Sequence, residues 1–338
     1  DYTLDQYEEE LEKIRTRKRN YTPWQVAIGA GFACGGFCVQ FGCDWMAFLY
    51  ASIAAIIGMR VRAKCNESGL NHYMGIAISA FIATMLAWAS TLLPAEWTST
   101  PWHPLLACAL FIVPGVPLIN FVDDMLDNYI QVGIVRAVNT LLMVSAMAFG
   151  IAFAVKLCSI GDFFPTISMV PHHNYLEYAI AAAISAMGFS MIFNIQRRLL
   201  WVVAIGGIIA VCTRNFVNLG PSTNNIGLDM GLVIGSFSGS VLVSLIAIKA
   251  VHWFHVPNHV LTIPSVIPMI PGVLMYRMLF GLINMNVQSI DQVTPLMKAI
   301  ESGVNSGLVI MCIALGVAIP NIFGRKYIAS SKNKRLAE

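Results

Sequence analysis

The chain has 338 residues, of which 57% are hydrophobic and only 12% are charged. Because a typical soluble domain carries about 25% charged residues, this composition excludes an ordinary soluble protein and predicts an all-α polytopic membrane protein. The net charge of +3 says little by itself, and no nucleic-acid partner is expected.

Residues 1–20 form the only long charged segment of the chain. Its apolar side chains fall on one helical face, at Leu4, Tyr7, Leu11 and Ile14. Basic residues follow from Lys13 to Arg19. The segment therefore predicts a cytoplasmic amphipathic helix with a basic collar, which either sets the membrane topology or meets anionic lipid heads.

Apolar runs long enough to suggest about ten transmembrane helices follow. They lie at residues 24–43, 45–61, 73–93, 105–122, 134–156, 175–194, 199–213, 227–250, 259–280 and 300–323. Most of the 21 lysines and arginines fall on one side of this arrangement, so both termini are expected in the cytoplasm.

The spans divide into two halves that resemble each other. The matching segments are Phe37–Phe41 with Phe189–Phe193, Ala54–Ile57 with Gly206–Ile209, and Arg62 with Arg214. Since each half has five spans, the second must enter the membrane from the opposite side, which predicts two inverted five-helix repeats. Chance similarity between apolar stretches is the alternative. The expected boundaries are a first repeat at 21–156, an external linker at 157–174, a second repeat at 175–323 and a cytoplasmic basic tail at 324–338.

One apolar run in each half contains a Pro-Gly pair. In the first, Pro114 and Pro117 have no N–H group to give to a helix, and Gly115 adds backbone freedom. Pro271-Gly272 recurs at the matching place in the second half. We therefore expect broken helices at both pairs, which is typical of a transporter binding site. The alternative is that both prolines are ordinary kinks.

The residues that carry a family resemblance are Phe193-Asn194, Gly206-Gly207, Arg214 and the block from Ile267 to Arg277, with Pro114-Gly115, Asp123–Asp127, Gly133 and Arg136 in the first half. They resemble the two halves of the threonine/serine exporter family, joined in one chain. The resemblance implies export of small hydrophilic metabolites across the bacterial inner membrane, with threonine and serine as the named substrates. Some two-subunit members are associated with succinate.

A zwitterionic substrate needs partners for both of its charges near mid-membrane. The N–H groups that start each second half-helix favour a carboxylate, so we expect the two breaks to meet and hold it between them. The expected substrate-binding residues are Pro114, Gly115, Pro117, Asn120, Pro271, Gly272, Tyr276 and Arg277.

Two further groups of polar residues are candidates. Asp123 and Asp124 could pair with the substrate ammonium or carry a coupling proton, although they could equally form a solvated cytoplasmic loop. Arg214 and Asn215, together with the second amide at Asn218, could line an outer vestibule, or the arginine could extend to the membrane interface.

The broken and repeated spans predict a secondary transporter, and the resemblance implies that it exports small hydrophilic metabolites, with threonine and serine as the expected substrates, driven by an ion gradient with protons as the expected coupling ion. A dicarboxylate such as succinate is the alternative substrate, and a channel or membrane scaffold is the alternative class. No nucleophile, metal ligand set or nucleotide motif is apparent, so we expect no enzyme activity, no metal and no cofactor. Runs of small residues would permit close helix contacts within one chain or in a homo-oligomer.

Overall fold

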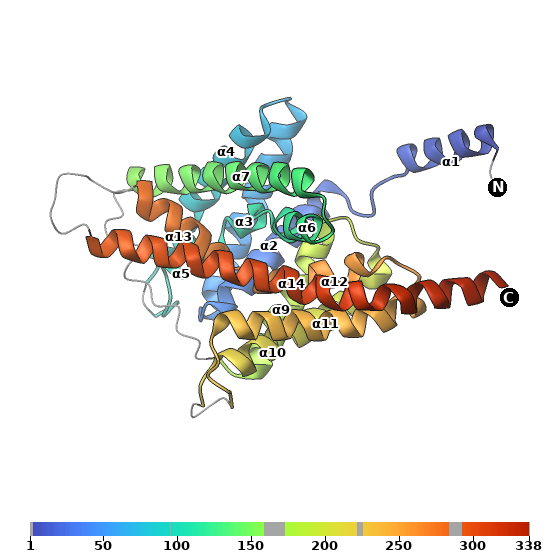
Figure 1. The fold of residues 1–338 in the computed structure, drawn as a ribbon. Helices are drawn as coiled ribbons and strands as arrows, with labels where there is room; N and C mark the ends of the chain where they lie inside the picture. The colour runs from blue at the N-terminus through green and yellow to red at the C-terminus, as the bar shows by residue number, and fades with distance from the viewer. Residues whose placement is uncertain (1–2, 95, 159–172, 222–225, 284–292, 338) are drawn as a thin grey trace.

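The computed structural model describes residues 3–94, 96–158, 173–221, 226–283 and 293–337, and they form a bundle of helices (Figure 1). Over these ranges, seven helices are long and apolar enough to cross a bilayer, or nine if each of two bent pairs is one span. The prediction of an all-α polytopic membrane protein is confirmed.

The helices follow the expected spans closely. The first half contains α1 (Leu4–Thr16), α2 (Pro23–Gln40), α3 (Trp45–Glu67), α4 (His72–Trp88), η1 (Ala89–Leu92), α5 (His103–Ala107), η2 (Leu110–Ile112), α6 (Gly115–Leu126) and α7 (Ile130–Leu157). The second contains α9 (Tyr175–Ile192), η3 (Arg197–Leu199), α10 (Leu200–Asn218), α11 (Leu232–Phe254), α12 (Asn258–Val266), η4 (Ile267–Met269), α13 (Gly272–Ile283) and α14 (Val293–Ala337).

Helix α2 accounts for the difference between about ten expected spans and the nine found. It has 18 residues, but it is not among the helices that are apolar enough to cross a bilayer. Most of its residues from Ala27 to Gln40 are buried by neighbouring helices. A helix that is covered by protein does not need the apolar surface that lipid requires, so a small, glycine-rich sequence is sufficient here.

Local sequence explains where the central helices begin. Thr22 and Gln25 form a capping box around the start of α2, with Pro23 at its first position. Asn174 and Glu177 form the equivalent box at α9. Asp44 accepts a 2.7 Å hydrogen bond from the Ala47 N–H group and so caps α3.

Helices α2 and α9 run in opposite directions beside each other. Asn20, just before α2, donates its N–H group to Oδ1 of Asn194, just after α9, at 2.8 Å. At the other end, His173 before α9 lies 2.9 Å through Nε2 from the carbonyl oxygen of Cys43 after α2. The first helix of the second half therefore enters the bundle from the side opposite the first helix of the first half.

The contact between α2 and α9 is reciprocal. A Cβ atom on Gly36 would lie 2.8 Å from Cβ of Ser185, and one on Gly188 would lie 2.5 Å from the backbone nitrogen of Ala33. By the sequence match between the halves, Gly36 corresponds to Gly188 and Ala33 to Ser185. The contact of Gly36 with Ser185 is therefore repeated by the contact of their counterparts, Gly188 and Ala33. Such a pair of equivalent contacts indicates that an approximate two-fold axis passes between α2 and α9.

Pairing between helices repeats in the same order. In the first half α2 packs on α3, α3 on α4, α4 on α7 and α6 on α7. In the second half α9 packs on α10, α10 on α11, α11 on α14 and α13 on α14. Helices α7 and α14 run in opposite directions across the molecule in Figure 1. This is the arrangement that two oppositely oriented copies of one motif would give.

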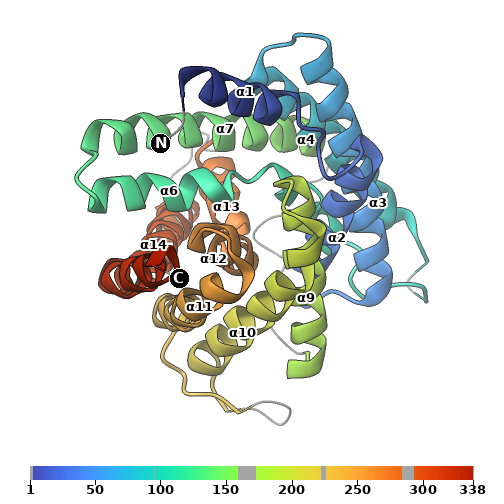
Figure 2. The ribbon, with the colours of Figure 1, turned by 90° about the vertical axis from the view of Figure 1, so that its right-hand side faces the viewer.

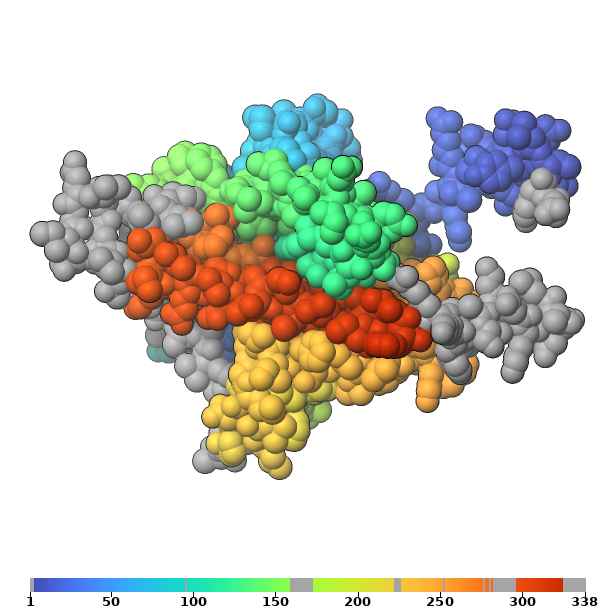
Figure 3. Space-filling view, in the orientation of Figure 1, coloured from blue at the N-terminus to red at the C-terminus, as the bar shows by residue number. Residues whose placement is uncertain are grey.

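The two ends of the chain lie on the same side of the bundle (Figure 1). Helix α1 stands apart from the other helices in the space-filling view (Figure 3), and none of its residues is buried. Seen from the side of the termini, α12 and α13 lie near the middle of the bundle (Figure 2). We refer below to the side that carries the two ends as the terminal side.

Candidate functional site

Both predicted breaks are present. The segment from His103 to Ile112 bends by 57° into α6, and the segment from Asn258 to Met269 bends by 61° into α13. At the first break, the Gly115 N–H group donates to the carbonyl oxygen of Val113 at 2.8 Å, across Pro114. At the second, the Gly272 N–H group donates to Ile270 at 2.9 Å in the same way. Each Pro-Gly pair therefore makes a tight turn that ends one helix and starts the next.

The two breaks meet in the middle of the molecule, and their contact is also reciprocal. A Cβ atom on Gly115 would lie 2.8 Å from Cδ1 of Ile270, and one on Gly272 would lie 3.1 Å from Cγ2 of Val113. Only about 10 Å³ of space remains beside the two glycines, and its lining is apolar. Apolar side chains therefore fill the place where we expected a carboxylate between the glycines.

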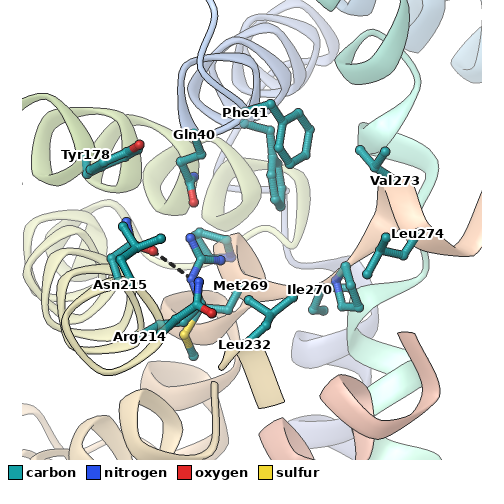
Figure 4. A pocket seen from close by; sticks show the side chains of 15 residues that line it. Gln40, Phe41, Tyr178, Arg214, Asn215, Leu232, Met269, Ile270, Val273 and Leu274 are labelled. Atoms are coloured by element: carbon teal, nitrogen blue, oxygen red, sulfur yellow. Dashed lines mark hydrogen bonds between the residues drawn. The ribbon is translucent and has the colours of Figure 1, made fainter. Parts of the chain in front are cut away.

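A larger cavity of about 310 Å³ lies next to the second break (Figure 4). Its polar lining consists of Gln40, Tyr178, Arg214, Asn215 and Asn218. Its other wall is formed by Phe37, Phe41, Leu219, Leu232, Pro268, Met269, Ile270, Pro271, Val273 and Leu274. None of these fifteen residues is acidic, so the only formal charge in the lining is positive.

The cavity lies on the side of the bundle opposite the termini. Gln40 ends α2, Tyr178 belongs to the first turn of α9, and Arg214 lies in the last turns of α10. The bonds from Asn20 to Asn194 place the other ends of α2 and α9 on the terminal side. The cavity therefore opens between helix ends that face away from the two termini.

Two polar side chains in this cavity have no hydrogen-bond partner among the described residues. Gln40 is 8% exposed and Tyr178 is 1% exposed. Neither the side-chain amide of Gln40 nor the hydroxyl of Tyr178 makes a hydrogen bond to any residue that the structure describes. An unsatisfied buried polar group costs about 1–3 kcal/mol. A ligand or water in the cavity would remove this cost.

Arg214 is half-buried and supplies the positive charge. Its Nε donates to Oδ1 of the buried Asn215 at 3.1 Å, which fixes the guanidinium beside Gln40 in Figure 4. Within the described part of the chain it has no carboxylate within ion-pair distance. An arginine that is held partly away from water without a counter-ion is costly, so an anionic ligand would stabilise it.

The start of α13 adds backbone donors to the same cavity. The Gly272 N–H group is used in the turn, and Met275 donates to the carbonyl oxygen of Pro271 at 3.2 Å. The N–H groups of Val273 and Leu274, which line the cavity, make no hydrogen bond within the described ranges. These two donors and the positive end of the helix dipole favour an anion.

The expected substrate-binding residues are only partly brought together. Pro271 lines the cavity, while Pro114, Gly115 and Gly272 form the closed contact beside it. Pro117 and Asn120 lie on α6, and Arg277 lies further along α13, and none of the three lines the cavity. The side chain of Tyr276 lies outside the described part of the structure.

The two candidate ion-coupling carboxylates lie at the end of α6, away from the cavity. Asp124 forms a 2.5 Å ion pair with Arg136 at the start of α7. A carboxylate oxygen of Asp123 is 3.9 Å from Nε2 of His259, in the first turn of α12. These contacts link α6 to α7 and α12.

Two polar residues of the cavity, Gln40 and Tyr178, were not among the candidates from the sequence. Gln40 could have been found, because an amide inside a run as apolar as Phe37–Phe41 is unusual for a membrane helix. Tyr178 gives no such signal, since tyrosine is common near the end of a span. The residues expected in a vestibule, Arg214, Asn215 and Asn218, belong to the cavity itself.

Comparisons with known proteins agree with this architecture. Residues 1–158 match the family described as "Putative threonine/serine exporter", and residues 178–323 match "Threonine/Serine exporter, ThrE". Similar proteins include one named "Probable succinate transporter subunit YjjP" from Klebsiella aerogenes, at 27% identity over 46% of this chain and 59% of that protein. A protein of the same name from Escherichia coli K12 is 29% identical over 40% of this chain and 53% of that protein.

The chain therefore spans between half and two thirds of the length of these relatives. No solved structure matches it. Two family models follow one another along the chain and meet near the middle, which agrees with the two structural halves. The chain belongs to the threonine/serine exporter family.

Proposed function

We propose that this protein is a secondary transporter that exports a small carboxylate-bearing metabolite, and that the cavity beside Arg214 is its substrate site. The main support is one observation: Arg214 and the first residues of α13, Val273 and Leu274, line a cavity in whose lining none of the described residues is acidic. Such a site attracts a carboxylate and offers it both charge and hydrogen bonds.

Two substrate classes fit this cavity. The family descriptions name threonine and serine, and the relatives are named as succinate transporter subunits. An amino acid would place its carboxylate at Arg214 and its ammonium near neutral oxygens, such as those of Gln40 and Tyr178. A dicarboxylate would use the same arginine and meet amide N–H groups at its second carboxylate. Since none of the described residues that line the cavity is acidic, the lining favours the dicarboxylate.

We further propose that the protein lies in the bacterial inner membrane with the terminal side in the cytoplasm. The clustering of lysine and arginine on that side supports this orientation. Coupling to a proton gradient remains a prediction from the sequence. The word "subunit" in the relatives' names favours an assembly with a second copy of this chain or with another membrane chain.

Counterflow in proteoliposomes tests this function. Purified protein would be loaded with unlabelled succinate, threonine or serine in parallel, and uptake of the matching labelled compound would be followed. We expect accumulation of at least one compound by the natural protein, and its loss in Arg214→Gln. Lys249→Gln is the matched control, because Lys249 is an exposed cation on α11 that does not line the cavity. No counterflow of any of the three by folded protein would contradict the proposal.

A further inference from the structure

An Arg-x-x-x-Asn sequence occurs once in each half of the molecule. Arg214 and Asn218 end α10 and line the cavity. Arg62 and Asn66 end α3, at the positions that match in the repeat. Residues four apart lie on the same face of a helix, so each pair presents a cation and an amide together.

The surroundings of the two pairs are equivalent as well. One turn before Arg62, a Cβ atom on Gly58 would lie 3.0 Å from Cζ of Phe111, in the segment that leads into the first break. One turn before Arg214, Ala210 packs against Gly239 of α11. Gly239 in turn lies beside Met269, and Met269 belongs to the segment that leads into the second break. Each arginine is therefore on the face of its helix that packs toward a break.

The amide ends of the two pairs also match. A Cβ atom on Gly75, at the start of α4, would lie 3.7 Å from Oδ1 of Asn66. A Cβ atom on Gly235, at the start of α11, would lie 3.1 Å from Cβ of Asn218. Since α4 and α11 hold the same place in the two halves, the two Arg-x-x-x-Asn pairs are related by the two-fold arrangement.

Arg62 is not neutralised by any carboxylate in the described part of the chain. It is half-buried, and it makes no hydrogen bond or ion pair with any residue in the described ranges. Its neighbour Arg60 differs, because the Arg60 guanidinium stacks 4.7 Å from the ring centre of Trp24. An arginine kept half-buried without a partner is costly unless an anion reaches it in some state of the protein.

The two arginines lie toward opposite sides of the membrane protein. Arg60, just before Arg62, contacts Trp24 at the start of α2, which is the terminal side. Arg214 lies at the opposite side and lines the cavity, whereas Arg62 is not among the residues that line it.

We propose that Arg62 and Asn66 form a second carboxylate-binding site, which holds the substrate when the protein opens toward the terminal side. This inference rests on the proposed transport function. In one state the cavity beside Arg214 is open and the site beside Arg62 is closed, and in the other state the reverse holds. The contact between the two breaks would open on one side of the membrane as it closes on the other.

The second site is less polar than the first. The residues that correspond in the repeat to the lining of the cavity beside Arg214 are mostly apolar. Ile192 corresponds to Gln40, Val26 to Tyr178 and Pro117 to Leu274. Pro117 has no N–H group, so α6 offers one free donor fewer than α13. We therefore expect weaker substrate binding from the terminal side than from the opposite side.

Exchange measured separately from each face of the membrane tests this inference. Right-side-out and everted vesicles would take up labelled succinate or labelled serine, with the unlabelled compound saturating on the other side. Arg62→Gln should raise KM at the terminal face at least about tenfold and leave KM at the other face unchanged. Arg214→Gln should do the reverse, and Arg62→Lys should recover part of the loss. Lys64→Gln is the matched control, because Lys64 is an exposed cation on the same helix.

The outcomes separate this inference from the proposed function. If the natural protein exchanges neither compound, the proposed function fails and the second site fails with it. If it does exchange one, but Arg62→Gln changes KM equally at both faces or at neither, only the second site is overturned. Should Arg62→Gln fail to fold, Arg62→Lys and Asn66→Ala decide, because Asn66 is exposed and its loss should still raise KM at the terminal face alone.

Discussion

Gly188 of α9 lies so close to Gly29 of α2 that a Cβ atom on Gly188 would be 2.4 Å from the Gly29 carbonyl oxygen. By the match between the halves, the same close approach recurs where a Cβ atom on Gly36 would be 2.6 Å from the carbonyl oxygen of Ala181, so the approximate two-fold axis passes between these two contacts. Small residues at such crossings allow membrane helices to pack closely.

The first prediction concerns this crossing. Gly188→Ala should destabilise the protein by about 3 kcal/mol or more, because the added methyl group meets backbone atoms that cannot turn aside. Thermal unfolding in detergent measures the change. The control is Gly307→Ala in α14, where the Cβ atom would meet nothing within 4 Å, and where alanine should leave stability equal or improved. Equal stability of the Gly188 variant and the natural protein would show that the crossing is looser than described.

A second prediction concerns the contact between the breaks. Gly115→Ala should cost less than Gly188→Ala, about 1–2 kcal/mol, because the new methyl group meets Cδ1 at the flexible end of Ile270. Ile270→Val removes that atom and should restore most of the loss. A double-mutant cycle on unfolding free energies measures the coupling. Independent, additive effects of the two substitutions would contradict the contact.

A third prediction separates a structural role of Asp124 from ion coupling. The 2.5 Å pair with Arg136 is partly exposed and should contribute no more than about 1 kcal/mol to stability. We therefore expect Asp124→Asn to keep substrate exchange within about twofold of the natural rate and to keep its pH dependence. Arg136→Gln is the matched variant, and it should behave in the same way. Loss of proton-driven export in Asp124→Asn alone would assign the coupling role to this carboxylate.

A fourth prediction concerns pH. Burial pushes the pKa of Asp44 upward, but hydrogen bonds from Ala47, Thr98 and Ser99 outweigh it and hold that pKa below its usual 3.8. Because the pKa is lower in the folded state, the stabilising contribution is complete above about pH 4 and is lost as the pH falls through the folded-state pKa. Asp44→Asn should therefore lose about 1–2 kcal/mol of unfolding free energy at neutral pH, and less in acid.

Unfolding measured between about pH 3 and pH 7 checks this sign. The difference between the natural protein and Asp44→Asn should shrink as the pH falls. A difference that is constant or grows in acid would mean that the hydrogen bonds to Asp44 do not stabilise its charged form.

Sequence patterns predicted the fold well and the site only in part. Span positions follow from long apolar runs, and the breaks follow from Pro114-Gly115 and Pro271-Gly272, because proline and glycine act through the local backbone. The sequence could not show that Ile270 and its neighbours fill the space between the breaks. That depends on how side chains from distant helices meet.

The polar cavity could not be predicted in full for the same reason. Arg214 was recognisable as an arginine at the end of an apolar run, but its neighbours Gln40 and Tyr178 come from two other helices. Only the crossing of α2 and α9 brings them together. The three side chains are far apart in the sequence, and no spacing rule connects them.

Equilibrium binding to the purified protein tests the central claim most directly. Labelled succinate and labelled serine would be titrated against the natural protein, Arg214→Gln and the Lys249→Gln control. If the cavity beside Arg214 is the substrate site, one of the two compounds should bind to the natural protein and to the control, and its Kd should rise at least about tenfold in Arg214→Gln. An unchanged Kd in a folded Arg214→Gln variant would contradict the account.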